Sequence, residues 1–536
     1  MKPYSVRDIV GPIMVGPSSS HTAGALRIAR MTRNLLDEDP VQATFTLYGS
    51  FAHTYRGHGT DRALVAGMLG MHTDDLRIRD SFELAREAGL DFSFRPDDEA
   101  KMEHPNTIDV AATGKSGREV TVRGVSVGGG AAELSRVNGI KVRITGEFNN
   151  MIIHEHDESG VLAHIAGELG RAGLNIASSR MYRTHAGGDS FTVMDVDEYV
   201  PDEVLQRILA HPAVQSVRFV PADGMHRMPR DPDATKDRKE ALEEFERLDF
   251  ASGSELLARC EAEGRSIAEV VQARELALLA SKGAPAESLD RYLARVLSAM
   301  RDSVEGPAEH PCASMGGLVG GEAAALRSLE QRGGGLDDQL FALATRYALA
   351  VLETNASMGL IVAAPTAGSS GVIPAVLLSL QRTQGFADAQ LVEALKNAAA
   401  VGMLIARNAT VAGAEGGCQA EIGSASAMAA SAATQLLGGT PRMCLEAASI
   451  ALSNMLGLVC DPVGGLVELP CQKRNATGAT NALAAAQMAL AGITGPAPFD
   501  EVVEAMYKVG RGIPYELRET ALGGIAACPS CKALCG

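Results

Sequence analysis

Hydrophobic and polar positions follow one another most regularly between residues 150 and 220. Alternation with a period of two predicts strands, and apolar positions three and four residues apart predict helices. The segment then contains, in order, a strand over 150–156, a helix over 161–172, strands over 175–184 and 190–197, a helix over 201–211 and a strand over 214–220. The order βαββαβ predicts a ferredoxin-like sandwich, which we place at residues 148–221.

The N-terminal region has a mixed pattern. Helical spacing over 21–37 is followed by strand-like runs over 43–48 and 119–127, the latter ending at three consecutive glycines from Gly128. Helices and strands intermixed in this way predict an α/β domain over residues 1–140.

The C-terminal half is different in composition. Residues 222–239 are rich in proline and charge, which is typical of a linker. Beyond them the chain is rich in Ala, Leu, Gly and Met with repeated helical spacing, so residues 240–536 are expected to form an all-α domain. The predicted fold class is therefore multidomain, with α/β, ferredoxin-like and all-α parts.

Composition excludes several classes of partner. The 536 residues carry a formal charge of −16, which disfavours nucleic acid and anionic membranes. Two uncharged stretches, 354–381 and 475–499, are interrupted by Gly, Pro, Ser, Thr and Asn, so we expect buried helices and loops rather than membrane spans. The N-terminus has no apolar signal region, and an odd number of cysteines, nine, favours reduced thiols in the cytoplasm.

Three cysteines stand in turns marked by Gly or Pro, beside charged or amide side chains: Cys418, Cys460 and Cys471. Soft thiolates that meet at turns are suited to an iron–sulfur cluster. Three protein ligands in place of four would leave one iron free to act as a Lewis acid.

The other cysteines predict less specific roles. Small core residues are the simplest interpretation of Cys260, Cys312 and Cys444. The C-terminal spacing Cys-x-x-Cys-x-x-x-Cys, from Cys528 to Cys535, is compatible with half a zinc site, a redox pair or a ligand tail. In the last case Cys535 would reach back to the open iron of the resting protein.

Histidines that could transfer protons lie outside the helical region, which contains His310 alone. His21 follows Ser18, Ser19 and Ser20 at the start of a predicted helix, where backbone N–H groups favour an anion such as a carboxylate. His58 lies between two glycines. The alternative for the Ser18–His21 loop is ordinary helix capping, and the alternative for His58 is a histidine in a surface turn. An active site between the N-terminal and helical domains is the simplest inference.

An uncharged loop in the helical region also offers donors. Thr366, Ser369 and Ser370 lie between two prolines, and their hydroxyl and amide groups could bind a carboxylate or an amine. A plain helix–helix connection is the alternative. From these residues alone, the sequence indicates a hydro-lyase of unknown substrate.

Taken together, the motifs resemble those of the iron–sulfur-dependent L-serine dehydratases over nearly the whole chain. The matching segments are Ser18–His21, Gly57–Asp61, Gly128–Gly130, Thr366–Gly371, Cys418, Cys460, Cys471 and the penultimate Cys535. The resemblance implies a [4Fe–4S] cluster on the three turn cysteines, no pyridoxal phosphate, and a homodimer that converts L-serine to pyruvate and ammonia. It also implies that His58 is the base, that His21 and the serine and glycine motifs bind substrate, and that Cys535 is the resting-state iron ligand.

The segment 148–221 resembles an ACT domain, a small regulatory module that often binds amino acids. Asn175 follows Gly160 by fifteen residues, as does the effector-binding Asn of the serine-binding ACT module in phosphoglycerate dehydrogenases. The effector-binding His of that module aligns with Glu155 here. A different effector, or purely structural dimerisation, is therefore an alternative to serine binding.

Two other functions are compatible with parts of the sequence. A pyridoxal-phosphate serine/threonine dehydratase would use a glycine-rich cradle such as Gly368–Gly371, but no lysine stands in a comparable motif and the turn cysteines would have no role. A non-catalytic amino-acid sensor would use the ACT-like segment, but it would not need the histidine loops.

Overall fold

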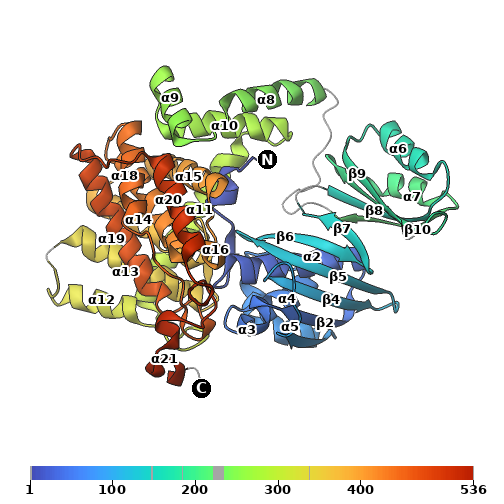
Figure 1. Cartoon of the computed structure of the whole chain (residues 1–536), viewed down its shortest axis with the longest axis horizontal. Helices are drawn as coiled ribbons and strands as arrows, with labels where there is room; N and C mark the ends of the chain where they lie inside the picture. Colours follow the sequence, from blue (N-terminus) through green and yellow to red (C-terminus); the bar gives the residue numbers. More distant parts are fainter. Residues whose placement is uncertain (1–2, 147–148, 184, 221–233, 337, 535–536) are drawn as a thin grey trace.

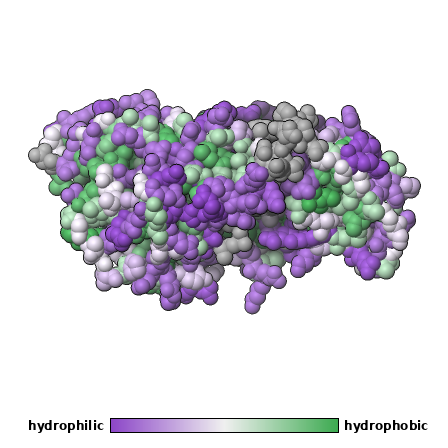
Figure 2. Space-filling view, turned by 90° about the horizontal axis from the view of Figure 1, so that it is seen from above, coloured by the Kyte–Doolittle hydropathy of each residue, from purple (hydrophilic) through white to green (hydrophobic). Residues whose placement is uncertain are grey.

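The structure is a computed structural model that describes residues 3–146, 149–183, 185–220, 234–336 and 338–534. Three regions follow one another along the chain (Figure 1): an N-terminal sheet with helices, a smaller sheet at one end of the molecule, and a helical body at the other end. Hydrophilic residues cover much of one long face, with hydrophobic residues gathered toward its two ends (Figure 2).

The N-terminal region contains a six-stranded sheet in the order β3-β2-β4-β5-β6-β7. β2 and β3 are parallel and the other neighbours are antiparallel. The strands are β2 (Pro40–Tyr48), β3 (Asp91–Asp97), β4 (Thr107–Gly114), β5 (Glu119–Gly128), β6 (Ala131–Val137) and β7 (Ile140–Ile144). The helices are α1 (Val6–Ile9), α2 (Ala25–Leu36), α3 (Ser50–Thr54), α4 (Thr60–Met68) and α5 (Ser81–Glu87), with 3₁₀-helix η2 (Leu76–Asp80). The predicted mixture of helices and strands is confirmed.

The central region has the predicted order of elements. They are β8 (Asn149–His156), α6 (Val161–Arg171), β9 (Ile176–Arg183), β10 (Asp189–Val196), α7 (Asp202–Leu209) and β11 (Val214–Val220), and the antiparallel sheet has the order β11-β8-β10-β9. One face of this sheet packs on α6 and α7 through Met151 and Ile153. The opposite face contributes Ile152 and Val193 to the core of the N-terminal sheet.

The C-terminal region is predominantly helical, as predicted. Its α-helices are α8 (Ala234–Leu248), α9 (Gly253–Glu263), α10 (Ile267–Ser281), α11 (Glu287–Glu309), α12 (Glu322–Gln331), α13 (Gln339–Ala356), α14 (Val372–Gln384), α15 (Asp388–Asn408), α16 (Gly413–Gly416), α17 (Ser424–Leu436), α18 (Pro441–Ser453), α19 (Cys471–Leu490), α20 (Phe499–Gly512) and α21 (Pro529–Leu534). Short 3₁₀ turns are η3 (Ala367–Ser369), η5 (Val463–Gly465), η6 (Tyr515–Leu517) and η7 (Gly524–Ala527). The expected linker, 222–239, falls mainly on 221–233, which lie outside the described residues, and helix α8 already begins at Ala234.

The helical region is not strictly all-α. Strand β12 (Leu360–Val362) pairs antiparallel with β1 (Ile13–Val15) from the other end of the chain. Val6, Ile9 and Met14 belong to the hydrophobic core of the helical region. The first residues of the chain therefore fasten the N-terminal region to the helices, close to the two loops that carry the predicted hydroxyl and histidine motifs.

One helix, α15, is long and apolar enough to cross a membrane by length and composition, but 72% of its most apolar window is buried in the protein. Of the two uncharged stretches noted in the sequence, 354–381 is mostly buried, as expected, whereas 475–499 is buried only on one side of α19 and residues 491–496 are exposed. Small residues allow neighbouring helices to pack closely around α15: its Ala398, Ala399 and Ala400 are fully buried.

Candidate active site

The loop Ser18–His21 is held in a defined shape at the start of α2. Residues Ser19–Gly24 form a π-helical turn (η1), and the Ser18 hydroxyl accepts a hydrogen bond from the His21 N–H at 3.1 Å. The His21 ring is fully buried, with Nδ1 3.1 Å from Ser20 Oγ and Nε2 2.9 Å from Ser50 Oγ. π-helical turns are rare in proteins, and those that occur often lie at functional sites. The predicted cluster of Ser18, Ser20 and His21 is thus present, with Ser50 as an additional member.

His58 lies directly against His21. The two ring centroids are 4.4 Å apart with the planes at 77°, and the Thr22 hydroxyl donates to the His58 carbonyl at 2.7 Å. Both ring nitrogens of His58 are buried without a hydrogen-bond partner among the described residues. Burial lowers the pKa of His58 to about 4, and the Gly465 backbone opposes this shift weakly. Burial and the neighbouring His58 also lower the pKa of His21, so both rings are neutral at pH 7.

The glycine turn at 128–130 adjoins this histidine pair. All three glycines have positive φ, and the Ser126 hydroxyl just before them donates to the Ser20 carbonyl at 2.8 Å. A Cβ on Gly130 would meet Ser19 O at 3.6 Å, whereas the Cβ position of Gly128 faces open space. The turn therefore borders the Ser18–His21 loop, as predicted, with an unobstructed position at Gly128.

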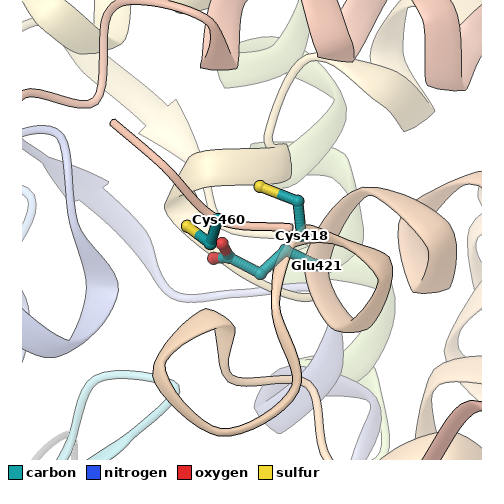
Figure 3. Close-up of side chains that lie close together, drawn as sticks. All are labelled: Cys418, Glu421 and Cys460. Carbon is teal, nitrogen blue, oxygen red and sulfur yellow. The ribbon is translucent and has the colours of Figure 1, made fainter. Parts of the chain in front are cut away.

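Two of the three predicted cysteine ligands come together with a carboxylate. One ligand atom each from Cys418, Glu421 and Cys460 lies within 4.8 Å of the others, and in Figure 3 the sulfurs and the carboxylate gather around one space. Cys418 precedes a second π-helical turn, η4 (Gln419–Gly423), which leads into α17. Glu421 was not predicted, although it follows Cys418 by only three residues.

Cys471 lies outside that group of three but is electrostatically linked to it. All three thiols are buried, at 2%, 3% and 7% exposure for Cys418, Cys460 and Cys471. Contact with Cys418 and burial raise the pKa of Cys460, and burial together with Cys418 raises that of Cys471. Arg474 places a guanidinium nitrogen 3.7 Å from Cys418 Sγ and 2.7 Å from Asp461. Metal binding at such thiols must displace protons.

The predicted hydroxyl loop touches the cysteine group. The Thr366 hydroxyl donates to Glu421 Oε1 at 2.7 Å and lies 3.1 Å from Ser369 Oγ. The Ser370 hydroxyl, 1% exposed, has no hydrogen-bond partner among the described residues. Burial raises the pKa of Glu421 to about 6 against the opposing effect of the Thr366 bond.

Two buried asparagines tie this loop to its surroundings. Asn355 donates to Ala367 O at 3.1 Å and also to Pro17 O at 3.3 Å, directly before the Ser18–His21 loop. Asn475 accepts from Gly371 N at 3.0 Å and donates to Gly368 O at 2.8 Å. Since Asn475 lies one turn after Cys471 on α19, hydrogen bonds connect the histidine loop, the hydroxyl loop and the cysteine helix.

A second route joins His58 to Cys471. A Cβ on Gly57 would lie 2.8 Å from the Leu466 side chain, so this loop packs directly on the segment that leads into α19. Within that segment Glu468, 2% exposed, accepts hydrogen bonds from Ser314 Oγ, Gly316 N and Leu318 N at 2.6 to 2.9 Å. The loop that carries His58 and the segment that leads to Cys471 are thus in direct contact.

Other predicted positions are resolved as follows. Cys260 and Cys444 are buried core residues, as expected, but Cys312 is exposed because it lies in the loop after α11, and that prediction was wrong. Asn175 is exposed and donates to Asp197 at 2.7 Å. The proposed tail ligand Cys535 lies outside the described residues. Ser50, Asn355 and Glu421 were missed because isolated polar residues carry no spacing signal.

Comparison with known proteins assigns each region. Residues 5–135 match the serine dehydratase beta chain family, 151–213 the ACT domain family and 234–526 the serine dehydratase alpha chain family. An L-serine dehydratase of Streptomyces coelicolor is 31% identical over 96% of both chains, and L-serine dehydratase 1 of Escherichia coli is 28% identical over 96% of this chain and 97% of its own. A probable L-serine dehydratase alpha chain of Bacillus subtilis is 48% identical over 46% of this chain and 81% of its own.

Proposed function

The chain belongs to the serine dehydratase family, and from this premise and the site we propose that it is an L-serine dehydratase. The reaction removes a proton from Cα and hydroxide from Cβ of L-serine, which together leave as water. The resulting enamine tautomerises to an imine, and hydrolysis of the imine yields pyruvate and ammonia. The observation that carries this proposal is the connection of a buried histidine pair to a group of buried thiols.

We propose that Cys418, Cys460 and Cys471 hold a [4Fe–4S] cluster. The donor set suits one: the three thiols are soft, buried, and presented by three separate segments of the chain. When bound, the cluster supplies Lewis acidity that helps the hydroxide leave. Arg474, within 3.7 Å of Cys418 Sγ, would stabilise thiolate charge there. Cys535 is proposed as the additional ligand of the resting protein.

His58 is the proposed base. Its ring is neutral at pH 7. The Gly465 backbone lies near the ring, but neither nitrogen makes a well-formed hydrogen bond with a described residue, so a lone pair is available to accept the Cα proton. His21, held by Ser20 and Ser50, keeps the His58 ring in place by direct contact.

The substrate carboxylate needs hydrogen-bond donors on the same side of the site. We propose that it is bound by hydroxyl and backbone N–H groups of the two loops and of the glycine turn. The residues proposed for this part of the site are Ser18, Ser19, Ser20, His21, Gly128, Thr366, Ser369 and Ser370, of which Thr366 donates to Glu421 and therefore positions the loop. The unpartnered hydroxyl of Ser370 supports this proposal, because a buried hydroxyl without a partner is costly unless a ligand satisfies it.

The test is anaerobic purification, a count of iron and sulfide per chain, and an assay for pyruvate and ammonia from L-serine. His58→Gln should lower kcat by about 10²- to 10⁴-fold with the cluster retained. The exposed His53, five residues earlier, provides the matched control His53→Gln, which should leave kcat unchanged. Full turnover by His58→Gln with an intact cluster would refute the base assignment, and absence of pyruvate from the wild-type protein would refute the function.

The lysines give little support to the alternative of a pyridoxal-phosphate enzyme. Lys396 is 3% exposed, but its amino group is 2.8 Å from Glu393 and 3.6 Å from Asp290. An ammonium held by two carboxylates is a poor candidate for a Schiff base, which requires a neutral amine. Absorbance of the purified protein at the aldimine band, in place of a broad iron–sulfur band, would favour this alternative.

We further propose that residues 148–221 form a ferredoxin-like ACT module that binds an amino-acid effector near Asn175, and that the protein is a cytoplasmic homodimer. The division into domains at 1–140, 148–221 and 240–536 belongs to the same proposal. Support comes from the βαββαβ order of the central region and from the exposed position of Asn175. Loss of effector binding in Asn175→Ala would test the site, and sedimentation would test the dimer.

A further inference from the structure

We propose that Glu421 binds the α-ammonium group of the substrate and so makes the site specific for an amino acid. This inference rests on the proposed function and names a residue for a part of the substrate that the groups described above leave without a partner. Hydroxyl and N–H groups serve a carboxylate, and a histidine serves the Cα proton, but an ammonium group calls for an anion.

Glu421 is fixed in position by its surroundings. Thr366 donates to Oε1 at 2.7 Å, and glycines border both oxygens. A Cβ on Gly368 would lie 3.1 Å from Oε1, and a Cβ on Gly413 would lie 2.5 Å from Oε2 and 3.4 Å from Cys460 Sγ. Side chains at these two positions would crowd the carboxylate, so the backbone keeps this space for it.

The surroundings of the Glu421 carboxylate leave its charge without a partner in the described part of the chain. Among the residues that the structure describes, none with a positive charge lies within ion-pair distance of Glu421. Arg474, the cation beside the thiols, is already engaged by Asp461 at 2.7 Å and by the Val459 carbonyl at 2.8 Å. Glu519 lies nearby and brings no positive charge; burial and the neighbouring Glu421 raise the pKa of Glu519 to about 8. A half-buried carboxylate without a cationic protein partner is stabilised most by a positively charged ligand.

The position also matches the shape of the substrate. In serine only two carbon atoms separate the hydroxyl oxygen from the ammonium nitrogen. A substrate whose hydroxyl lies at the group held by the cysteines must therefore carry its ammonium a short distance away. The Glu421 carboxylate lies within 4.8 Å of the sulfurs of Cys418 and Cys460 (Figure 3), and its hydrogen bond from Thr366 joins it to the hydroxyl loop. The unpartnered Ser370 hydroxyl in that loop independently points to a bound ligand.

L-Alanine and propionate distinguish this role from others, because they differ only by the α-ammonium group and neither has a hydroxyl to eliminate. Their dissociation constants would be measured by calorimetry on the anaerobic holoenzyme. Wild type should bind L-alanine more tightly than propionate, and Glu421→Gln should reduce this preference about tenfold or more with propionate affinity nearly unchanged. Glu415→Gln is the matched control: this carboxylate lies in the same segment, is held by Thr410 at 2.6 Å, and should leave the preference unchanged.

Three outcomes would overturn the inference. An unchanged alanine-to-propionate ratio in Glu421→Gln would show that the carboxylate does not recognise the ammonium. Loss of iron or a changed cluster spectrum in this variant would make Glu421 a cluster ligand. Equal changes of the alanine-to-propionate ratio in Glu415→Gln and Glu421→Gln would show that the overall negative charge of this region, and not a contact with Glu421, produces the preference. None of these depends on turnover, so failure of the wild-type protein to make pyruvate from serine would be a separate result that refutes the proposed function.

Discussion

Replacement of Glu468 by glutamine should loosen the site without touching any residue proposed to bind substrate or cluster. The Glu468 carboxylate is buried and joins the segment before Cys471 to the loop after α11. Oε1 accepts from Gly316 N at 2.7 Å, and Oε2 accepts from Ser314 Oγ at 2.6 Å and Leu318 N at 2.9 Å. Glutamine has nearly the same shape, but it presents an N–H donor where one of these oxygens stood.

The magnitude follows from the hydrogen bonds. If the amide oxygen takes the place of Oε2, two bonds persist without charge assistance and the Gly316 N–H faces another donor. A hydrogen bond to a charged acceptor contributes about 1.5–3 kcal/mol, and a buried donor without a partner costs about 1–3 kcal/mol. The loop should therefore lose about 3 kcal/mol of local stability, which corresponds to a roughly 150-fold larger opening constant because each 1.4 kcal/mol is a factor of ten. Leu466 packs on both Gly57 and Gly316, so kcat should fall as the His58 loop loses its support.

Hydrogen exchange measures this opening directly, since the Gly316 and Leu318 amides are themselves the donors. The matched control is Glu353→Gln, in which a buried carboxylate that caps Gly321 N at 3.0 Å and Ala323 N at 2.7 Å is changed in the same way. The control should speed exchange at 321–323 and leave kcat close to wild type. Unchanged exchange at Gly316 and Leu318 in Glu468→Gln, or equal losses of kcat in both variants, would refute the reasoning.

Three further predictions concern protons, space and thiols. The pKa of His58 is about 4 in the folded protein and 6.5 in the unfolded chain, so the folded protein loses stability as the pH falls. Between pH 7 and 5 the free energy of unfolding in urea should fall by about 2 kcal/mol more for wild type than for His58→Gln. An equal pH dependence in the two proteins would contradict this. Gly413→Ala should reduce the preference for L-alanine over propionate with iron content unchanged, because its Cβ would lie 2.5 Å from Glu421 Oε2, and an unchanged preference would count against it. In the native protein the exposed Cys312 should react with a thiol reagent long before Cys444, which is buried and whose pKa burial raises to about 12. Earlier labelling of Cys444, measured by mass spectrometry, would contradict this.

The central region was the most predictable part of the fold. One face of its sheet packs on helices and the other on the N-terminal sheet, yet strand and turn signals remained regular, and β11 was predicted to the residue. The local errors are small: Pro201 caps α7 and is not its first residue. Short-range periodicity determines such elements, and it is visible in a single sequence.

The site was predictable only in part. Thiols in turns and histidines between small residues have recognisable local contexts, so both halves were found separately. What joins them is long-range: Asn355 bridges to Pro17, 338 residues earlier in the chain, and Glu468 bridges to a loop about 150 residues earlier. A single amide or carboxylate has no periodicity, and π-helical turns such as η1 and η4 have no composition signal. These features follow from tertiary packing, which a local pattern does not contain.

The same packing makes the two halves of the site interdependent. Strand β1 pairs with β12, which ends four residues before Thr366, and the Gly11 N–H donates to the Ala363 carbonyl at 2.8 Å. The chain passes from this pairing directly into the Ser18–His21 loop. The Ser18–His21 loop therefore takes part of its position from the helical region that holds the cysteines and part from its own sheet, where the Ser126 hydroxyl donates to the Ser20 carbonyl. A shift of the N-terminal sheet as a body would be resisted at this loop by the β1–β12 pairing and by the hydrogen bond from Asn355 to the Pro17 carbonyl.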